Sequence, residues 1–195
     1  MKIFPVQLKI PDEAVQALRS GEIVCYPTET FYALGIDPLN EAAREKLYKA
    51  KGRSAEKELP LIASDEEMVA KFCDTNDPRL KKLAARFWPG PLTIVLPSKD
   101  AAHNYAIRIS SNPIACNLAK SFGAPIVSTS ANASGSSPVQ DPRNLLDSIQ
   151  KNVSLLLDAG LCPGGFPSTI ISLLEKPGRI LREGAIHSRE ILSLL

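Results

Sequence analysis

The 195-residue sequence predicts a single α/β domain in which helices cover a sheet. Two observations support this class. Short runs rich in Val, Ile and Leu alternate along the chain with amphipathic segments, a pattern typical of strands and of the helices that pack on them. The chain also contains no internal repeat, no low-complexity tract and no linker longer than about a dozen residues, so we expect one domain.

Helices are expected where amphipathic segments follow a capping residue. An Asp-Pro or Asn-Pro pair stands at 77–78, 112–113 and 141–142, and it places an N-cap residue before a proline at the first helical position. The sequence of 64–67, Ser-Asp-Glu-Glu, is typical of a capping box. We therefore expect helices over 12–20, 41–50, 65–72, 78–87, 113–122, 142–150 and 188–194.

Strands are expected at the apolar runs, most of which are rich in β-branched residues. These runs are 23–26, 60–63, 92–96, 106–109, 125–129, 154–158, 168–172 and 179–182. Three stretches rich in Gly, Pro and Ser follow such runs, at 27–35, 130–138 and 160–167. Because open α/β sheets bind ligands in loops at strand ends, these three stretches are the candidate site segments.

The composition excludes several classes of protein. The 23 Lys and Arg residues against 21 Asp and Glu give a net charge of only +2, so any polyanion must meet a local cluster of cations. The four cysteines lie more than 40 positions apart without a CxxC pair, as expected of unpaired thiols in a cytoplasmic protein. No apolar run approaches the roughly 18 residues that a membrane helix needs, so we expect no membrane contact.

The familiar catalytic motifs are also missing from the sequence. It contains no GxxxxGK[ST] or GxGxxG phosphate loop, no HExxH and no GxSxG nucleophile elbow. Of its two histidines, His103 lies in a polar run and is expected to be an exposed loop residue. A nucleotide site, if present, must therefore be built from dispersed cations and loop groups.

One group of cations follows the expected helix 41–50. Lys51 and Arg53 come directly after it, and Lys57 comes four residues later. A charge-assisted hydrogen bond to a phosphate is worth about 1.5–3 kcal/mol, so convergent cations can replace a phosphate loop. The alternative is that these cations are favoured simply by the negative end of the helix macrodipole.

A different cation, Arg108, stands inside the apolar run 106–109. In a strand it shares a face with Ala106 and Ser110. The side chain either faces solvent or projects into a cleft, where a guanidinium matches the carboxylate of an amino acid.

The segment 128–138 is the most unusual in the chain, because it is dominated by serines around an Ala-Asn pair. Hydroxyl, amide and backbone N–H groups at such a turn suit phosphate or ribose oxygens. A flexible or capping Ser/Gly loop is the alternative. The segments 26–35, 164–169 and 180–184 pose the same choice between ligand contact and turn formation.

In this order, the segments closely resemble the YrdC/TsaC family of threonylcarbamoyl-AMP synthases, from about residue 21 to residue 184. The motifs that carry the resemblance are YPTET (26–30), KxR (51–53), WPGPLT (88–93), AIR (106–108), STSANxSG (128–135), PSTI (167–170) and LREG (181–184). The resemblance implies a twisted, open, mixed sheet with helices on its faces and a concave basic cleft. It further implies one domain over 1–195, with a core of about 11–185 and no additional C-terminal domain.

The resemblance also implies a nucleotidyltransferase reaction. L-Threonine, bicarbonate and ATP would give L-threonylcarbamoyladenylate and pyrophosphate, with Mg²⁺ carried by the ATP phosphates, for the t6A37 modification of tRNA. Downstream t6A transferase proteins are the implied partners, and direct contact with tRNA or other RNA is an open possibility.

Site residues follow from the same resemblance, position by position. Lys51 and Arg53 match the catalytic pair that holds the ATP phosphates and bicarbonate. The remaining ATP-binding positions are Lys57, Ser130, Asn132, Ser137 and Arg182, and the threonine-binding positions are Thr28, Arg108, Ser128 and Ser168. No residue is assigned as a general base or as a metal ligand.

Four positions depart from the usual pattern of the family. Ala33 stands where a second glycine is common, Ser54 and Glu183 stand where proline is common, and Glu58 separates Lys57 from Leu59. Ala33 and the Arg-Glu-Gly ending point toward the paralogous YciO branch, whereas Lys51, Arg53 and the intact Ser-Ala-Asn triplet point toward the synthase. The same basic cleft also suits an RNA-binding protein, or a carbamoyl-transfer module like that of hydrogenase-maturation proteins.

Overall fold

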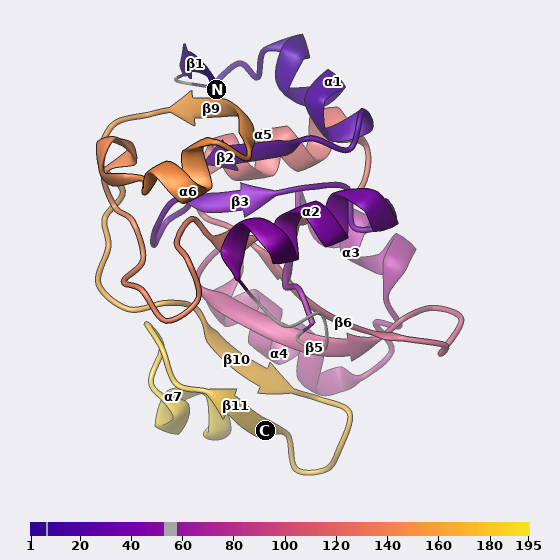
Figure 1. Ribbon diagram of the computed structural model, residues 1–195. Helices are drawn as coiled ribbons and strands as arrows, with labels where there is room; N and C mark the ends of the chain where they lie inside the picture. Colours follow the sequence, from indigo (N-terminus) through magenta and orange to yellow (C-terminus); the bar gives the residue numbers. More distant parts are fainter. Residues whose placement is uncertain (7, 53–57) are drawn as a thin grey trace.

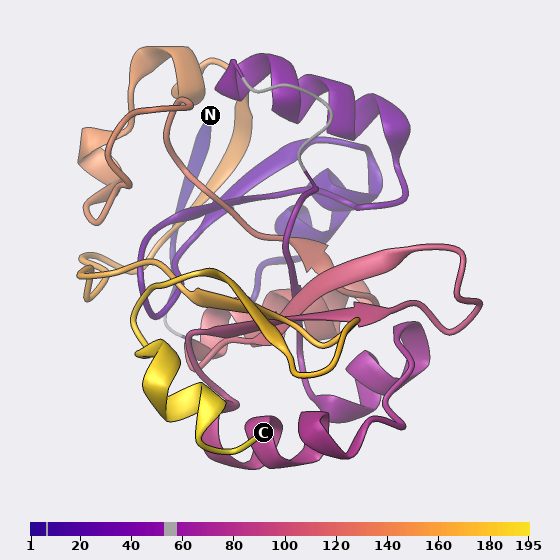
Figure 2. The same cartoon turned by 90° about the horizontal axis from the view of Figure 1, so that it is seen from below.

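The computed structural model describes residues 1–6, 8–52 and 58–195 and contains two mixed β-sheets with helices packed against them (Figure 1). The predicted α/β class is confirmed, and the strands divide between two sheets where the sequence indicated one. The N-terminal strand lies at the top of the view in Figure 1 and the two C-terminal strands lie at its bottom, whereas in the turned view of Figure 2 the C-terminal strands cross the middle of the molecule.

The first sheet has five strands in the order β1-β9-β2-β3-β8. Two of them, β1 and β2, run parallel to β9, whereas β3 is antiparallel to both of its neighbours. The strands are β1 (Lys2–Pro5), β2 (Ile23–Tyr26), β3 (Ala33–Gly35), β8 (Thr129–Ser130) and β9 (Val153–Asp158).

The second sheet has six strands in the order β11-β10-β5-β6-β4-β7. Its central pair, β5 and β6, is antiparallel, while β10 runs parallel to β5 and β4 runs parallel to β6. The strands are β4 (Leu61–Ala63), β5 (Leu92–Pro97), β6 (Asn104–Ile109), β7 (Ile126–Val127), β10 (Thr169–Ser172) and β11 (Arg179–Arg182).

The chain crosses from one sheet to the other at Ser128. The expected single strand 125–129 is wrong, because β7 pairs with β4 in the six-stranded sheet and β8 pairs with β3 in the five-stranded sheet. Between them, the backbone N–H of Ser128 donates to the carbonyl of Pro60 at 2.7 Å. The segment 128–138, called the Ser-rich segment below, therefore begins where the two sheets meet.

The helices begin largely where the capping residues predict. The side chains of Asp77 and Asn112 accept from backbone N–H groups at the starts of α4 and α5. In the 64–67 segment, Asp65 rather than Ser64 is the N-cap residue of α3, and it accepts from the N–H of Met68. The helices are α1 (Asp12–Arg19), α2 (Glu41–Lys51), α3 (Glu66–Phe72), α4 (Pro78–Phe87), α5 (Pro113–Phe122), α6 (Asp147–Gln150) and α7 (Ser188–Leu192).

The expected helix over 142–150 is wrong. A 3₁₀ turn over Pro142–Asn144 is followed by Leu145 and Leu146 in extended conformation before α6 begins. Burial of the Leu145 side chain in the core accompanies this break. Two strands, β1 and β3, were not anticipated, because an exposed edge strand and a three-residue strand carry little periodic signal.

Side chains of both sheets contribute to the hydrophobic core, for example Val24 and Leu34 from one and Ile62 and Ile107 from the other, all of which are fully buried. α5 contacts both α1 and β4, and α1 contacts β2 and β9. All four cysteines are unpaired, as predicted. Among the described residues, no helix has the length and apolar character needed to cross a membrane.

Candidate functional site

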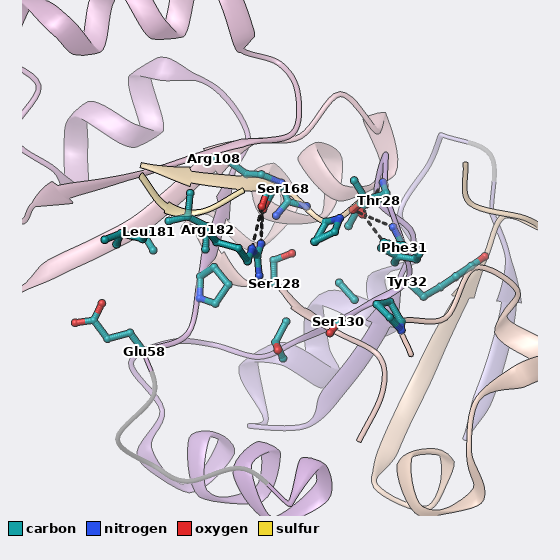
Figure 3. Close-up of a pocket in the computed structure, with 18 of the residues that line it drawn as sticks. Thr28, Phe31, Tyr32, Glu58, Arg108, Ser128, Ser130, Ser168, Leu181 and Arg182 are labelled. Carbon is teal, nitrogen blue, oxygen red and sulfur yellow. Dashed lines mark hydrogen bonds between the residues drawn. The ribbon is translucent and has the colours of Figure 1, made fainter. Parts of the chain in front are cut away.

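A cavity of about 380 Å³ lies between the two sheets (Figure 3). Its lining combines the turn after β2, the crossover at Ser128, the face of the six-stranded sheet and the loop before β10. Six residues that the sequence predicts for the site line this cavity, namely Thr28, Arg108, Ser128, Ser130, Ser168 and Arg182.

Arg108 projects into the cavity rather than to open solvent. It lines the cavity together with Ala106, its neighbour on the same face of β6, and it is only 5% exposed. Ile107 and Ile109 point to the opposite face and are buried in the core. The sequence left open whether Arg108 faces solvent or a cleft, and the cavity on this face of β6 shows that it faces a cleft.

The guanidinium of Arg108 forms a buried ion pair. Its Nε donates to Oε1 of Glu29 at 3.1 Å, and the two side chains are 6% and 10% exposed. The hydroxyl of Ser110, which directly follows β6, donates to the other carboxylate oxygen. Arg108 is thus held from one side by Glu29, which belongs to the turn after β2.

Thr28 both closes a turn and lines the cavity, so the two interpretations of this loop are compatible. Its Oγ1 accepts from the backbone N–H groups of Thr30 and Phe31 at 3.2 Å and donates to the carbonyl of Phe31 at 2.7 Å. This network holds the turn that carries Glu29 toward β6.

Ser168 and Arg182 form a second polar group at the cavity wall (Figure 3). Nη2 of Arg182 donates to the carbonyl of Ser168 at 2.7 Å and to its Oγ at 3.0 Å. That Oγ also lies 2.9 Å from Oγ1 of Thr93, which is fully buried. A hydroxyl and a guanidinium are therefore held side by side in a fixed arrangement.

Lys51 contacts the backbone of the Ser-rich segment and is not among the residues that line the cavity. Its side chain is buried, and Nζ donates to the carbonyls of Ser130 and Asn132, the latter at 2.7 Å. The N–H of Ser134 donates back to the carbonyl of Lys51 at 2.8 Å. The end of α2 and the Ser-rich segment are thereby joined.

Asn132 has a buried acceptor that lacks a donor. Its Nδ2 donates to the carbonyls of Ala133 and Ser136 at 2.9 and 2.6 Å, which fixes the orientation of the amide. Oδ1 then has no hydrogen-bond partner among the described residues. An unsatisfied buried oxygen is unusual and indicates a place where a further donor belongs.

The remaining predicted positions lie elsewhere. Arg53 and Lys57 lie outside the described residues. Ser137 is exposed and lines a neighbouring hollow of about 430 Å³ rather than the main cavity.

Sequence reasoning missed Glu29, Ser110 and Thr93. A signal for Glu29 exists, since it is an acid three positions after the end of the buried strand 23–26, but the turn was interpreted through its threonines. Ser110 shares the predicted face of Arg108 and was noted only as a neighbour. Thr93 closes the WPGPLT motif but stands inside a buried apolar strand, and the motif was not used to assign it a role.

No activated nucleophile or metal cluster is present among the described residues. Burial raises the pKa of Cys162 to about 11, so this thiol, close to the turn of Thr28, is protonated at neutral pH. Burial also raises the pKa of Tyr32, whose hydroxyl donates to the carbonyl of Gly160. Across residues 1–6, 8–52 and 58–195, no group of three or more His, Cys, Asp or Glu side chains can hold a metal ion.

The fold and the cavity define a mixed α/β protein with a polar, arginine-containing pocket between its two sheets. Residues 16–184 match the Sua5/YciO/YrdC family, which is described as telomere recombination. The chain belongs to this family, and the resemblance based on the ordered motifs is confirmed.

Curated relatives carry the name threonylcarbamoyl-AMP synthase. The Coxiella burnetii (strain RSA 493) protein is 35% identical over 179 residues, which cover 88% of this chain and 95% of that protein. The Pyrococcus abyssi protein is 32% identical over 182 residues, which cover 89% of this chain and 54% of that protein. The chain therefore spans about half the length of the Pyrococcus relative.

Solved structures of the family superpose closely. Pyrococcus abyssi Sua5 complexed with L-threonine matches with a TM-score of 0.90 at 30% identity, over 100% of this chain and 61% of that one. Escherichia coli YciO matches with a TM-score of 0.84 at 26% identity, over 96% of this chain and 98% of that one.

Proposed function

We propose that this protein is an L-threonylcarbamoyladenylate synthase, a nucleotidyltransferase that acts in the cytoplasm for the t6A modification of tRNA. The observation that carries the proposal is the cavity between the sheets, into which Arg108 projects from β6. Relatives that bear this name, and a related Sua5 structure complexed with L-threonine, support the assignment of an amino-acid substrate.

The amino-acid end of the cavity is assigned to Arg108, with Thr28, Ser128 and Ser168. A guanidinium recognises a carboxylate through two parallel N–H bonds, which gives orientation as well as charge neutralisation. The three hydroxyl-bearing residues line the same cavity and offer partners for the hydroxyl and amino groups of threonine.

The nucleotide end is assigned to the Ser-rich segment and the cations near it. Ser130 lines the cavity, and the unpartnered Oδ1 of Asn132 lies in the same segment, where a hydroxyl or amine of ATP is a fitting donor. Lys51 brings positive charge to this segment, and Arg182 brings it to the opposite wall. Arg53, Lys57 and Ser137 complete the proposed ATP contacts by resemblance alone.

The chemistry requires positioning more than proton transfer. The amino group of threonine and bicarbonate give N-carboxythreonine and water, and a carboxylate oxygen of that carbamate attacks the α-phosphorus of ATP. The bond from the α-phosphorus to the β-bridging oxygen breaks, and pyrophosphate leaves. Because the nucleophile is already anionic, fixed cations and hydrogen-bond donors supply the catalysis, and no general base is needed.

Magnesium is proposed to enter as the counterion of the ATP phosphates. Magnesium at nucleotide sites usually keeps several waters and is bound through phosphate oxygens, so no side chain is assigned to it as a ligand. Its contribution is to neutralise charge on the phosphates as pyrophosphate leaves.

The reaction product provides the direct test of this proposal. The purified protein is incubated with ATP, Mg²⁺, L-threonine and ¹³C-bicarbonate, and the mixture is analysed by mass spectrometry. We expect an adenylate that contains threonine and one ¹³C carbon, and that is absent when any one substrate is omitted. A folded protein that forms no such adenylate contradicts the proposal.

RNA binding in the same cleft is the alternative of a different class. Backbone contacts to RNA would make affinity fall steeply with salt and would involve the cleft arginines to a similar degree. Transfer of the product to tRNA by a separate transferase fits the small size of the cavity, about 380 Å³, which is suited to small substrates. Salt-dependent tRNA binding without threonine-dependent adenylate formation would favour the alternative.

A further inference from the structure

The carboxylate of Glu29 connects Arg108 of β6 with Ser110, which directly follows the strand. It accepts from Nε of Arg108 at 3.1 Å through Oε1 and from the hydroxyl of Ser110 through Oε2. The Ser110 hydroxyl is itself anchored, because it accepts from the backbone N–H of Asn112 at 3.1 Å. Glu29 is therefore fixed at both oxygens, while the turn made by Thr28 fixes its backbone.

This contact determines which edge of the guanidinium is available. With Nε engaged by Glu29, the donors that remain on Arg108 are those of Nη1 and Nη2, and no hydrogen bond among the described residues uses either atom. Neither atom is fully buried. In the described part of the chain only one fully buried side-chain polar atom lacks a hydrogen-bond partner, and that atom is Oδ1 of Asn132. Arg108 lines the cavity, so Nη1 and Nη2 are the guanidinium donors left for a group bound there.

We propose that Glu29 is a positioning residue for the substrate carboxylate. By holding Nε and Ser110 at once, it turns the end-on edge of the Arg108 guanidinium into the cavity, where two parallel N–H groups receive the carboxylate of the amino acid. This inference rests on the proposed function and adds a residue that acts through Arg108 rather than by touching the substrate.

Orientation, and not charge, is the contribution of Glu29. A second carboxylate beside the site opposes the binding of an anion, so the negative charge of Glu29 by itself weakens substrate binding. Its benefit is to fix a flexible arginine before the substrate arrives, which lowers the entropy that binding costs. Charge and shape can therefore be separated by substitution.

Two substitutions separate them. Glu29→Asp keeps the charge but shortens the side chain by one methylene, so it cannot reach both Arg108 and Ser110 from the same backbone position. Glu29→Gln removes the charge but keeps the length, because its carbonyl oxygen still accepts from Nε and its amide can donate to Ser110. As a matched control, Glu22→Asp alters a remote ion pair with Lys46.

The readout is the dissociation constant of L-threonine, compared with that of L-threoninol, which lacks the carboxylate, by calorimetry. We expect Glu29→Asp to weaken L-threonine binding about tenfold, in line with the loss of one well-aligned charged contact, and to leave L-threoninol unchanged. Glu29→Gln is expected to stay within about threefold of the wild type or to bind more tightly. Glu22→Asp is expected to change neither constant.

Equal losses for both ligands in Glu29→Asp would indicate a merely structural role and overturn the inference, as would wild-type affinity in that variant. If Glu29→Asp does not fold, Ser110→Ala is tested in its place. This substitution removes the hydroxyl that donates to Oε2 of Glu29 and leaves every charge in place. A selective loss of L-threonine affinity in Ser110→Ala supports the inference, and an unchanged ratio of the two constants refutes it. A wild-type protein that binds no L-threonine contradicts the proposed function itself, a failure that is visible before any variant is made.

Discussion

Replacing Lys51 by methionine removes the ammonium that joins α2 to the Ser-rich segment. The carbonyls of Ser130 and Asn132 each lose a charged donor, and such bonds are worth about 1.5–3 kcal/mol apiece. The variant no longer buries an ammonium, which offsets part of this loss because burying a charge is itself costly. We expect a net destabilisation of about 2–3 kcal/mol, within the range seen for broken buried networks.

This free energy converts into a measurable change in melting temperature. An unfolding entropy of about 2.1 cal/mol/K per residue gives about 0.4 kcal/mol/K for 195 residues, so the melting temperature should fall by about 5–7 °C. Lys49→Met is the matched control, since Lys49 is an exposed residue in the same last turn and should shift the melting temperature by about 1 °C at most. Equal melting temperatures for the two variants in calorimetry would refute this account of Lys51.

Other substitutions probe the polar networks and the buried thiol. Ser168→Ala leaves the fully buried hydroxyl of Thr93 without this partner and should lower the melting temperature and raise the KM for threonine. The pKa of Cys162 is raised from 9.0 to about 11, so the contribution of the buried thiol to stability is complete below pH 9 and is lost as the pH rises through 11. Chemical denaturation of Cys162→Ser should therefore show a smaller fall in the free energy of unfolding over this pH range. Asp77→Ala removes the N-cap of α4 and the partner of Arg79, which should cost about 1 kcal/mol or more at pH 7 in urea unfolding. Since Arg79 lowers the pKa of Asp77, that difference should shrink as the pH falls below the unfolded value of 3.8.

Local signals predicted most of the helices and the central strands. α4 and α5 begin at the proline that follows Asp77 and Asn112, because capping and a fixed proline φ act within a few residues. The face of Arg108 also followed from the two-residue period of a strand. Such interactions are readable because they do not depend on the rest of the fold.

The division into two sheets was not readable in the same way. A continuous apolar run across 125–129 gives no sign that its halves pair with different strands, since the partners β4 and β3 are distant in sequence. The contact of Lys51 with the Ser130 carbonyl, and that of Glu29 with Arg108, span 79 residues each. Only the folded chain brings these groups together, so nothing in the sequence indicated that they are in contact.

Pyrophosphate release is the measurement that tests the central claim most directly. The wild-type protein is assayed with ATP, Mg²⁺ and bicarbonate, with and without L-threonine, and beside an Arg108→Gln variant of confirmed folding. The account predicts release that requires L-threonine and that, in the variant, needs a much higher threonine concentration at an unchanged KM for ATP. Release that is independent of threonine, or an Arg108→Gln variant with wild-type threonine dependence, would contradict it.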